Sequence, residues 1–148
     1  MIMSEQPPEV PIILEEPDFR RMLAREVQRA TRYPDFLSLC LVRLDPPARP
    51  DAAISIGIAR KLAEMLRGSD LVGMVGQDIA VILVHTPDTD AIAITDRMQR
   101  ALQELVLTPS GGGRSPFTVE LALVAFPGDA TTDEGLLDRA RARLPKLS

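Results

Sequence analysis

The chain has 148 residues, enough for one domain and little more. Hydrophobic residues make up 45% and charged residues 26%, which is typical of a globular protein with a packed core. Aromatic residues make up only 3%, and the formal net charge is −4. These values argue against a nucleic-acid partner, which would need stacking platforms or a basic surface to neutralise phosphates.

The negative charge is concentrated at the N-terminus. The first 18 residues carry five acids and neither Lys nor Arg, so the rest holds 17 basic and 16 (21 − 5) acidic residues. Four of the 13 prolines also lie in the first 17 residues. We therefore expect an acidic, Pro-rich tail over residues 1–17 and a folded domain over residues 18–148. Within the tail, the apolar residues 12–14 could add to a sheet as a short strand or bind a partner.

Cysteine and histidine usage excludes several kinds of site. With one cysteine, Cys40, and one histidine, His85, the chain cannot build a disulfide framework or a Cys/His-rich zinc site. We interpret Cys40 as a buried small hydrophobe and His85 as a loop residue. No apolar run approaches the roughly 18 residues that span a bilayer, and the N-terminus lacks a signal-peptide pattern. The expectation is a cytoplasmic protein without a membrane partner, a bound metal or another cofactor.

The spacing of apolar residues predicts an alternation of helices and strands. Helices are expected over residues 18–32, 52–67, from 86 or 88 to about 105, and from a capping box at 131–134 to about 144. Strands are expected over residues 36–44, 70–75, 79–84 and 117–126. Asp18 and Asp51 are the predicted caps of the first two helices, and residues 108–116 are predicted to form a flexible surface loop.

After the first helix, the predicted order is strand, helix, strand, strand, helix, strand, helix. The first six of these elements form the split βαβ arrangement of ferredoxin-like folds. The predicted fold class is therefore α+β, with a four-stranded antiparallel sheet and helices on one face.

A motif in the middle of the chain carries a family resemblance. Arg67 and Asp70 form an R-x-x-D motif. After five intervening residues comes a predicted turn that reads GQDIA, namely Gly76, Gln77, Asp78, Ile79 and Ala80. This resembles the GGDEF domain of diguanylate cyclases, where R-x-x-D precedes a G-G-[DE]-E-F hairpin turn. Residues 36–45, FLSLCLVRLD, are similar to the family's P-L-S-L-L-L-L-D-L-D strand. The resemblance covers residues 18–146 and implies a nucleotide-cyclase palm fold.

The resemblance also implies that cyclase chemistry is lost. Members of the family cyclise two GTP molecules with metal-binding positions in the first strand and in the hairpin turn. Arg43 stands at the first position, and a guanidinium cannot ligate a cation but repels it by about 1–4 kcal/mol. Other positions also depart from the family's pattern. Gln77 stands in place of a glycine, Ile79 in place of a glutamate and Met74 in place of a basic residue. Residues 46–51 stand in place of a guanine-binding segment. The remaining acids, Asp45 and Asp78, are expected to be solvated, the alternative being that they lie near one another.

Arg67 and Asp70 match the family's inhibitory product site, which binds cyclic di-GMP. Either Arg97 or Arg100 could supply a further arginine to that site. The alternative interpretation is structural: Arg67 complements a helix C-terminus, and Asp70 is an ordinary turn residue. We therefore expect no enzyme but an interaction or dimerisation module, with cyclic di-GMP at the R-x-x-D site as its candidate regulator. The alternatives are a cyclic di-GMP receptor and, more remotely, a residual diguanylate cyclase.

Overall fold

The computed structural model describes residues 12–49, 51–107 and 117–144, and these form five strands and four helices. The predicted surface loop over residues 108–116 and most of the predicted tail lie outside these residues. The elements in chain order are β1 (Ile13–Leu14), α1 (Glu16–Arg32), β2 (Leu37–Asp45), α2 (Ala53–Glu64), β3 (Leu71–Val75), β4 (Asp78–Val84), α3 (Asp88–Leu107), β5 (Thr118–Phe126) and α4 (Asp133–Arg143).

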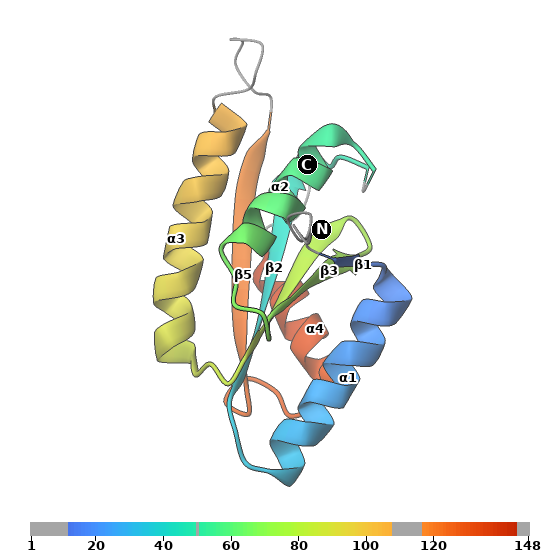
Figure 1. The fold of residues 1–148 in the computed structure, drawn as a ribbon, viewed down its shortest axis with the longest axis vertical. Coiled ribbons are helices and arrows are strands. Elements are labelled where there is room, and N and C mark those ends of the chain that lie inside the picture. The colour runs from blue at the N-terminus through green and yellow to red at the C-terminus, as the bar shows by residue number, and fades with distance from the viewer. Residues whose placement is uncertain (1–11, 50, 108–116, 145–148) are drawn as a thin grey trace, which may run out of the picture.

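All five strands belong to one sheet, in the order β1-β3-β4-β2-β5 (Figure 1). The pairs β3–β4, β4–β2 and β2–β5 are antiparallel, and β1 joins the edge of β3 in parallel. The predicted split βαβ order therefore holds from β2 to β5, and the α+β class is confirmed.

Helices cover both faces of the sheet, so the prediction of helices on one face is wrong. Leu37, Leu39 and Leu41 of β2 pack in a core with α1 and α4, whereas Cys40 and Val42 pack in a second core with α2 and α3. Figure 1 shows α1 and α4 on one side of the sheet and α3 on the other. The split βαβ unit supplies helices to one face only, and the flanking helices α1 and α4 cover the other. The nearly continuous apolar run of β2 is typical of such a doubly covered strand.

The folded body begins before the predicted boundary at Asp18. Ile13 and Leu14 pair with β3, which confirms that this apolar segment adds a short strand, and α1 begins at Glu16. Asp18 is therefore inside the helix and does not cap it, since the N-cap position is Glu15, without a side-chain cap bond.

Two further caps differ in part from the predictions. The N-cap of α2 is Ala52 and makes no side-chain bond, so the predicted cap at Asp51 is wrong. At α4 the cap is Thr132, whose hydroxyl oxygen accepts from the Gly135 N–H at 2.9 Å.

Cys40 is fully buried in β2, as predicted for a small hydrophobe. Burial raises the pKa of its thiol to about 12, so the reactive thiolate is not formed at neutral pH. Within the described ranges, the structure contains no helix of the length and apolarity needed to traverse a bilayer.

The start of α1 packs closely on β3 at Gly73. A Cβ atom on Gly73 would lie 2.7 Å from Cδ2 of Phe19 and 2.8 Å from the carbonyl oxygen of Leu14. Glycine at this position therefore lets both β1 and α1 approach β3. A side chain here would force the N-terminal segment away from the sheet.

We predict that Gly73→Ala destabilises the protein by about 1–3 kcal/mol, because the added methyl group overpacks the contact with Phe19 and Leu14. Chemical denaturation of the full chain measures this change. Gly57→Ala is the matched control: a Cβ at this α2 position meets nothing within 4 Å, so we expect a gain of about 0.5–1 kcal/mol. Equal stability of Gly73→Ala and the native chain would contradict the close packing.

Candidate functional site

A charged pair joins β2 to β4 at the end of their ladder. The last residue pair of that ladder is Val42 with Ile79, which places Arg43 beside Asp78. Arg43 donates from Nε to Oδ1 of Asp78 and from Nη2 to Oδ2, both at 2.8 Å. The two side chains are only 18% and 6% exposed. The hydrogen bond to Asp78 raises the pKa of Arg43 above its ordinary value.

This geometry corrects the expectation that Asp78 is solvated, since its carboxylate is buried and bound by a planar fork of two donors. A divalent cation would need these same oxygens as hard ligands. The guanidinium holds them and brings its own positive charge, so the residues present do not fit a metal. Among the described residues, no group of three His, Cys, Asp or Glu side chains could hold a metal ion.

Gly76 and Gln77 form the turn that joins β3 to β4, and the rest of the GQDIA motif begins β4. Gly76 adopts the left-handed conformation, with φ of 61°, and its N–H donates to Oε1 of Glu16 at 2.5 Å. This bond lowers the pKa of Glu16 below its usual range. Gln77 is exposed, whereas Ile79 and Ala80 are buried in the core. The fourth position of the motif is thus filled by a core side chain and presents no acid.

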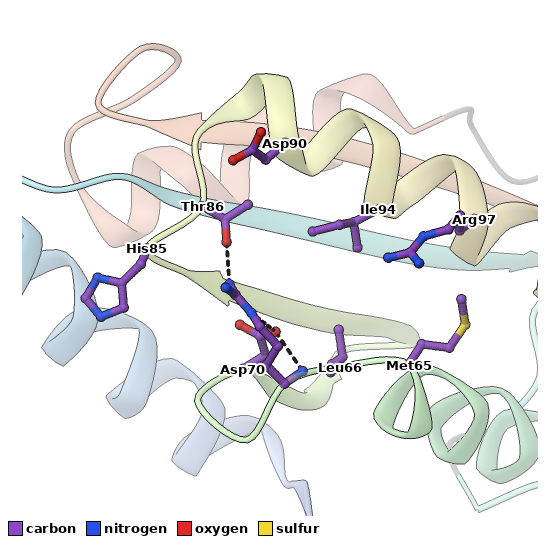
Figure 2. A pocket seen from close by; sticks show the side chains of 9 residues that line it. Met65, Leu66, Asp70, His85, Thr86, Asp90, Ile94 and Arg97 are labelled. Atoms are coloured by element: carbon purple, nitrogen blue, oxygen red, sulfur yellow. Dashed lines mark hydrogen bonds and ion pairs between the residues drawn. The ribbon is translucent and has the colours of Figure 1, made fainter.

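A separate pocket of about 210 Å³ lies between the end of α2 and α3 (Figure 2). It is lined by Met65, Leu66, Arg67, Asp70, His85, Thr86, Asp90, Ile94 and Arg97. Arg67, Asp70 and Arg97 of the predicted binding set therefore meet at one pocket. Arg100 is exposed on α3 and does not line it.

Asp70 is used to hold the loop between α2 and β3. Its Oδ2 accepts from the backbone N–H of Arg67 and its Oδ1 from that of Val84, both at 3.1 Å. The side chain is 2% exposed. Asp70 thus ties the loop to the end of β4, which is a structural role.

The guanidinium of Arg67 binds the end of β4 and the residue Thr86 that follows it. Its Nη2 donates to the carbonyl oxygen of Val84 and to Oγ1 of Thr86, each at 2.8 Å, while 59% of the side chain stays exposed. Thr86, its partner, was not predicted from the sequence, because no local pattern marks a contact between residues 19 positions apart.

The remaining wall of the pocket mixes charge with apolar surface. In Figure 2, Arg97 and Ile94 extend from α3 over the space bounded by Leu66 and Met65, and the ring of His85 points away from it. His85 instead contacts Asp35, in the loop before β2. Two guanidinium groups beside apolar side chains suit a planar polar ring that carries an anionic group. Drug-sized ligands fill pockets of about 300–1,000 Å³, so this one would hold only part of such a molecule.

The family match agrees with this fold and motif. The family described as "Diguanylate cyclase, GGDEF domain" matches residues 52–147, which is about two thirds of the chain. The chain therefore belongs to the GGDEF domain family. No protein with a curated description is similar enough to match it.

Solved GGDEF domains share the fold. The GGDEF domain of YfiN (TpbB) from Pseudomonas aeruginosa is similar with a TM-score of 0.73 and 22% identity, over 88% of this chain and 86% of that one. The GGDEF domain of DgcB from Caulobacter crescentus, in complex with cyclic di-GMP, is similar with a TM-score of 0.67 and 14% identity, over 96% of this chain and 88% of that one. The active GGEEF domain of a diguanylate cyclase from Vibrio cholerae is similar with a TM-score of 0.70 and 13% identity, over 90% of this chain and 89% of that one. At these identities the likeness shows the fold alone.

Proposed function

We propose that this chain is a catalytically inactive GGDEF domain that acts as an interaction or dimerisation module. The observation that carries the proposal is the ion pair between Arg43 and Asp78. Cyclisation of nucleoside triphosphates needs a divalent cation to stabilise the attacking hydroxyl and the phosphates. Here a guanidinium stands at one of the two metal-binding positions and binds the carboxylate at the other.

Two further positions support the loss of chemistry. Gln77 brings a side chain to a turn position where glycine would let the backbone approach phosphate closely. Ile79 is buried in the core, so the turn has no acid at its fourth position. The domain nevertheless keeps a hydrophobic core on each face of the sheet, which supports a role that needs the fold without the chemistry.

The proposal predicts that the purified chain, incubated with GTP and Mg²⁺ or Mn²⁺, forms no cyclic di-GMP and no linear dinucleotide intermediate. Chromatography of the reaction mixture measures both products. Sustained turnover that scales with protein concentration would contradict the proposal.

A matched variant tests whether Arg43 is what keeps the metal out. In Arg43→Asp, two carboxylates face each other across β2 and β4 with no guanidinium between them. Millimolar Mn²⁺ should raise the melting temperature of this variant by roughly 3–6 °C at about ten times its dissociation constant. The native chain should show no such rise. A rise in the native chain, or none in the variant, would contradict the role given to Arg43.

A second candidate function is a cyclic di-GMP receptor. The observation that favours it is the meeting of Arg67 and Arg97 at one pocket. Arginine forks suit the guanine edge and the phosphates of that ligand. Because the Asp70 carboxylate already accepts two backbone N–H groups, the arginines would carry recognition.

For the receptor function, calorimetric titration with cyclic di-GMP should show micromolar binding. Arg97→Ala should weaken it at least about tenfold, because a charge-assisted hydrogen bond is lost. Arg100→Ala, on the same helix but outside the pocket, should bind like the native chain. No heat at high micromolar ligand would reject the receptor function, and an equal loss in both variants would reject this pocket.

A further inference from the structure

The strand β5 forms one edge of the sheet and pairs only with β2 among the described strands. The Ala125 N–H points outward, since it donates to Oδ2 of Asp129 at 2.8 Å. Backbone groups alternate in direction along an antiparallel strand. The N–H and C=O groups of Val119, Leu121 and Leu123 therefore also face away from β2.

The two halves of this edge differ. In the C-terminal half, Asp129 holds the Ala125 N–H, and Arg143 donates to the carbonyl oxygen of Leu123 while pairing with Asp129. In the N-terminal half, no hydrogen bond joins the outward backbone groups of Val119 or Leu121 to another described residue. Residues 118–121, called the open edge below, thus present the unpaired backbone donors and acceptors of Val119 and Leu121.

A pocket of about 320 Å³ adjoins the open edge on the side of α3. Val106 of α3 and Val119 of β5, both nearly fully buried, contribute to its wall together with Phe117. Such a pocket can receive an apolar side chain from a strand laid along β5. In peptide binding by strand addition, backbone bonds supply affinity and pockets for alternate side chains supply specificity.

Glu120 also lines this pocket, but the alternation of β5 directs its side chain to the face opposite that of Val119. In the ladder it stands directly across from Arg43, whose guanidinium is bound to Asp78. No hydrogen bond or ion pair joins the half-buried Glu120 carboxylate to another described residue. The row Asp78, Arg43 and Glu120 across three strands therefore carries one surplus negative charge at the edge.

We propose that the open edge binds an extended segment of a partner protein as an added strand, with a Lys or Arg opposite Glu120. Side chains of an added strand alternate between the two faces. Its residues beside the basic one would therefore point toward α3, where Val106, Phe117 and Val119 form the apolar part of a pocket whose lining is completed by Gln103, Thr118 and Glu120. The partner chemistry is an alternating apolar–basic–apolar strand.

A second copy of this chain fits the open edge poorly. The symmetric antiparallel register that uses both open residues pairs Val119 with Leu121 of the other copy. That register sets the two Glu120 side chains directly opposite each other, where like charges destabilise pairing. A register shifted toward Leu123 meets the carbonyl oxygen that Arg143 already holds.

The test is a titration of the isotopically labelled full chain with a capped peptide, Thr-Val-Lys-Val-Lys-Val-Thr, followed by NMR. We expect shifts and slowed hydrogen exchange at the backbone amides of Val119 and Leu121. The same peptide with Glu in place of Lys should bind about tenfold more weakly, and Glu120→Lys should reverse this preference. A peptide N-methylated at the amides that face β5 should not bind, and this control leaves the protein unchanged.

Several outcomes would overturn the proposal. These are no shift at Val119 and Leu121 at millimolar peptide, equal binding of the Lys and Glu peptides, or undiminished binding of the N-methylated peptide. Protection of both amides in a dimer of the chain alone would show that a second copy occupies the edge. The proposal rests on the interaction role given above. If the peptide does not bind, only the assignment of the open edge as a binding surface is rejected. Turnover of GTP would instead reject the proposed function.

Discussion

The proposed role of this domain depends on the ion pair between Arg43 and Asp78. Burying two charges costs several kcal/mol, and two hydrogen bonds of 2.8 Å between a guanidinium and a carboxylate offset that cost. Removing one partner of such a buried pair costs about 3–5 kcal/mol, because the other charge remains uncompensated. The pair thereby ties the end of β2 to the start of β4. The proposed role, binding without metal-assisted chemistry, rests on this contact.

The strand β4 separates the Arg43–Asp78 ion pair from the pocket lined by Arg67 and Arg97. Asp78 begins β4 and Val84 ends it, so the ion pair and the loop held by Asp70 lie about 20 Å apart along one buried strand. At the first end, Glu16 of α1 binds the turn, and Gly73 lets α1 approach. At the other end, Arg67 and Asp70 fix the pocket wall through backbone bonds. The two sites therefore lie at opposite ends of β4 and share no hydrogen bond among the described residues.

The sequence predicted most of the elements, because the apolar spacing of the helices and the GQDIA turn are local patterns. It did not predict that helices cover both faces, since α1 and α4 lie outside the recognised supersecondary unit. The caps at Asp18 and Asp51 were wrong because these two helices begin without a side-chain cap bond, at Glu15 and Ala52, and a polar residue near a helix start does not reveal this. The state of Asp78 was missed because its partner is 35 residues away and depends on the register between β2 and β4. Arg67 and Asp70 were predicted together, with either Arg97 or Arg100 as a further arginine, and only the packing of α3 against the loop places Arg97 at the pocket.

The most direct test of the central claim is a crystal structure of the chain soaked with Mn²⁺ and a non-hydrolysable GTP analogue, with the anomalous signal of manganese recorded. The account predicts no manganese peak between β2 and β4, and Arg43 still bound to both oxygens of Asp78. A manganese ion coordinated by Asp78, with Arg43 turned away and the triphosphate at the turn, would contradict it.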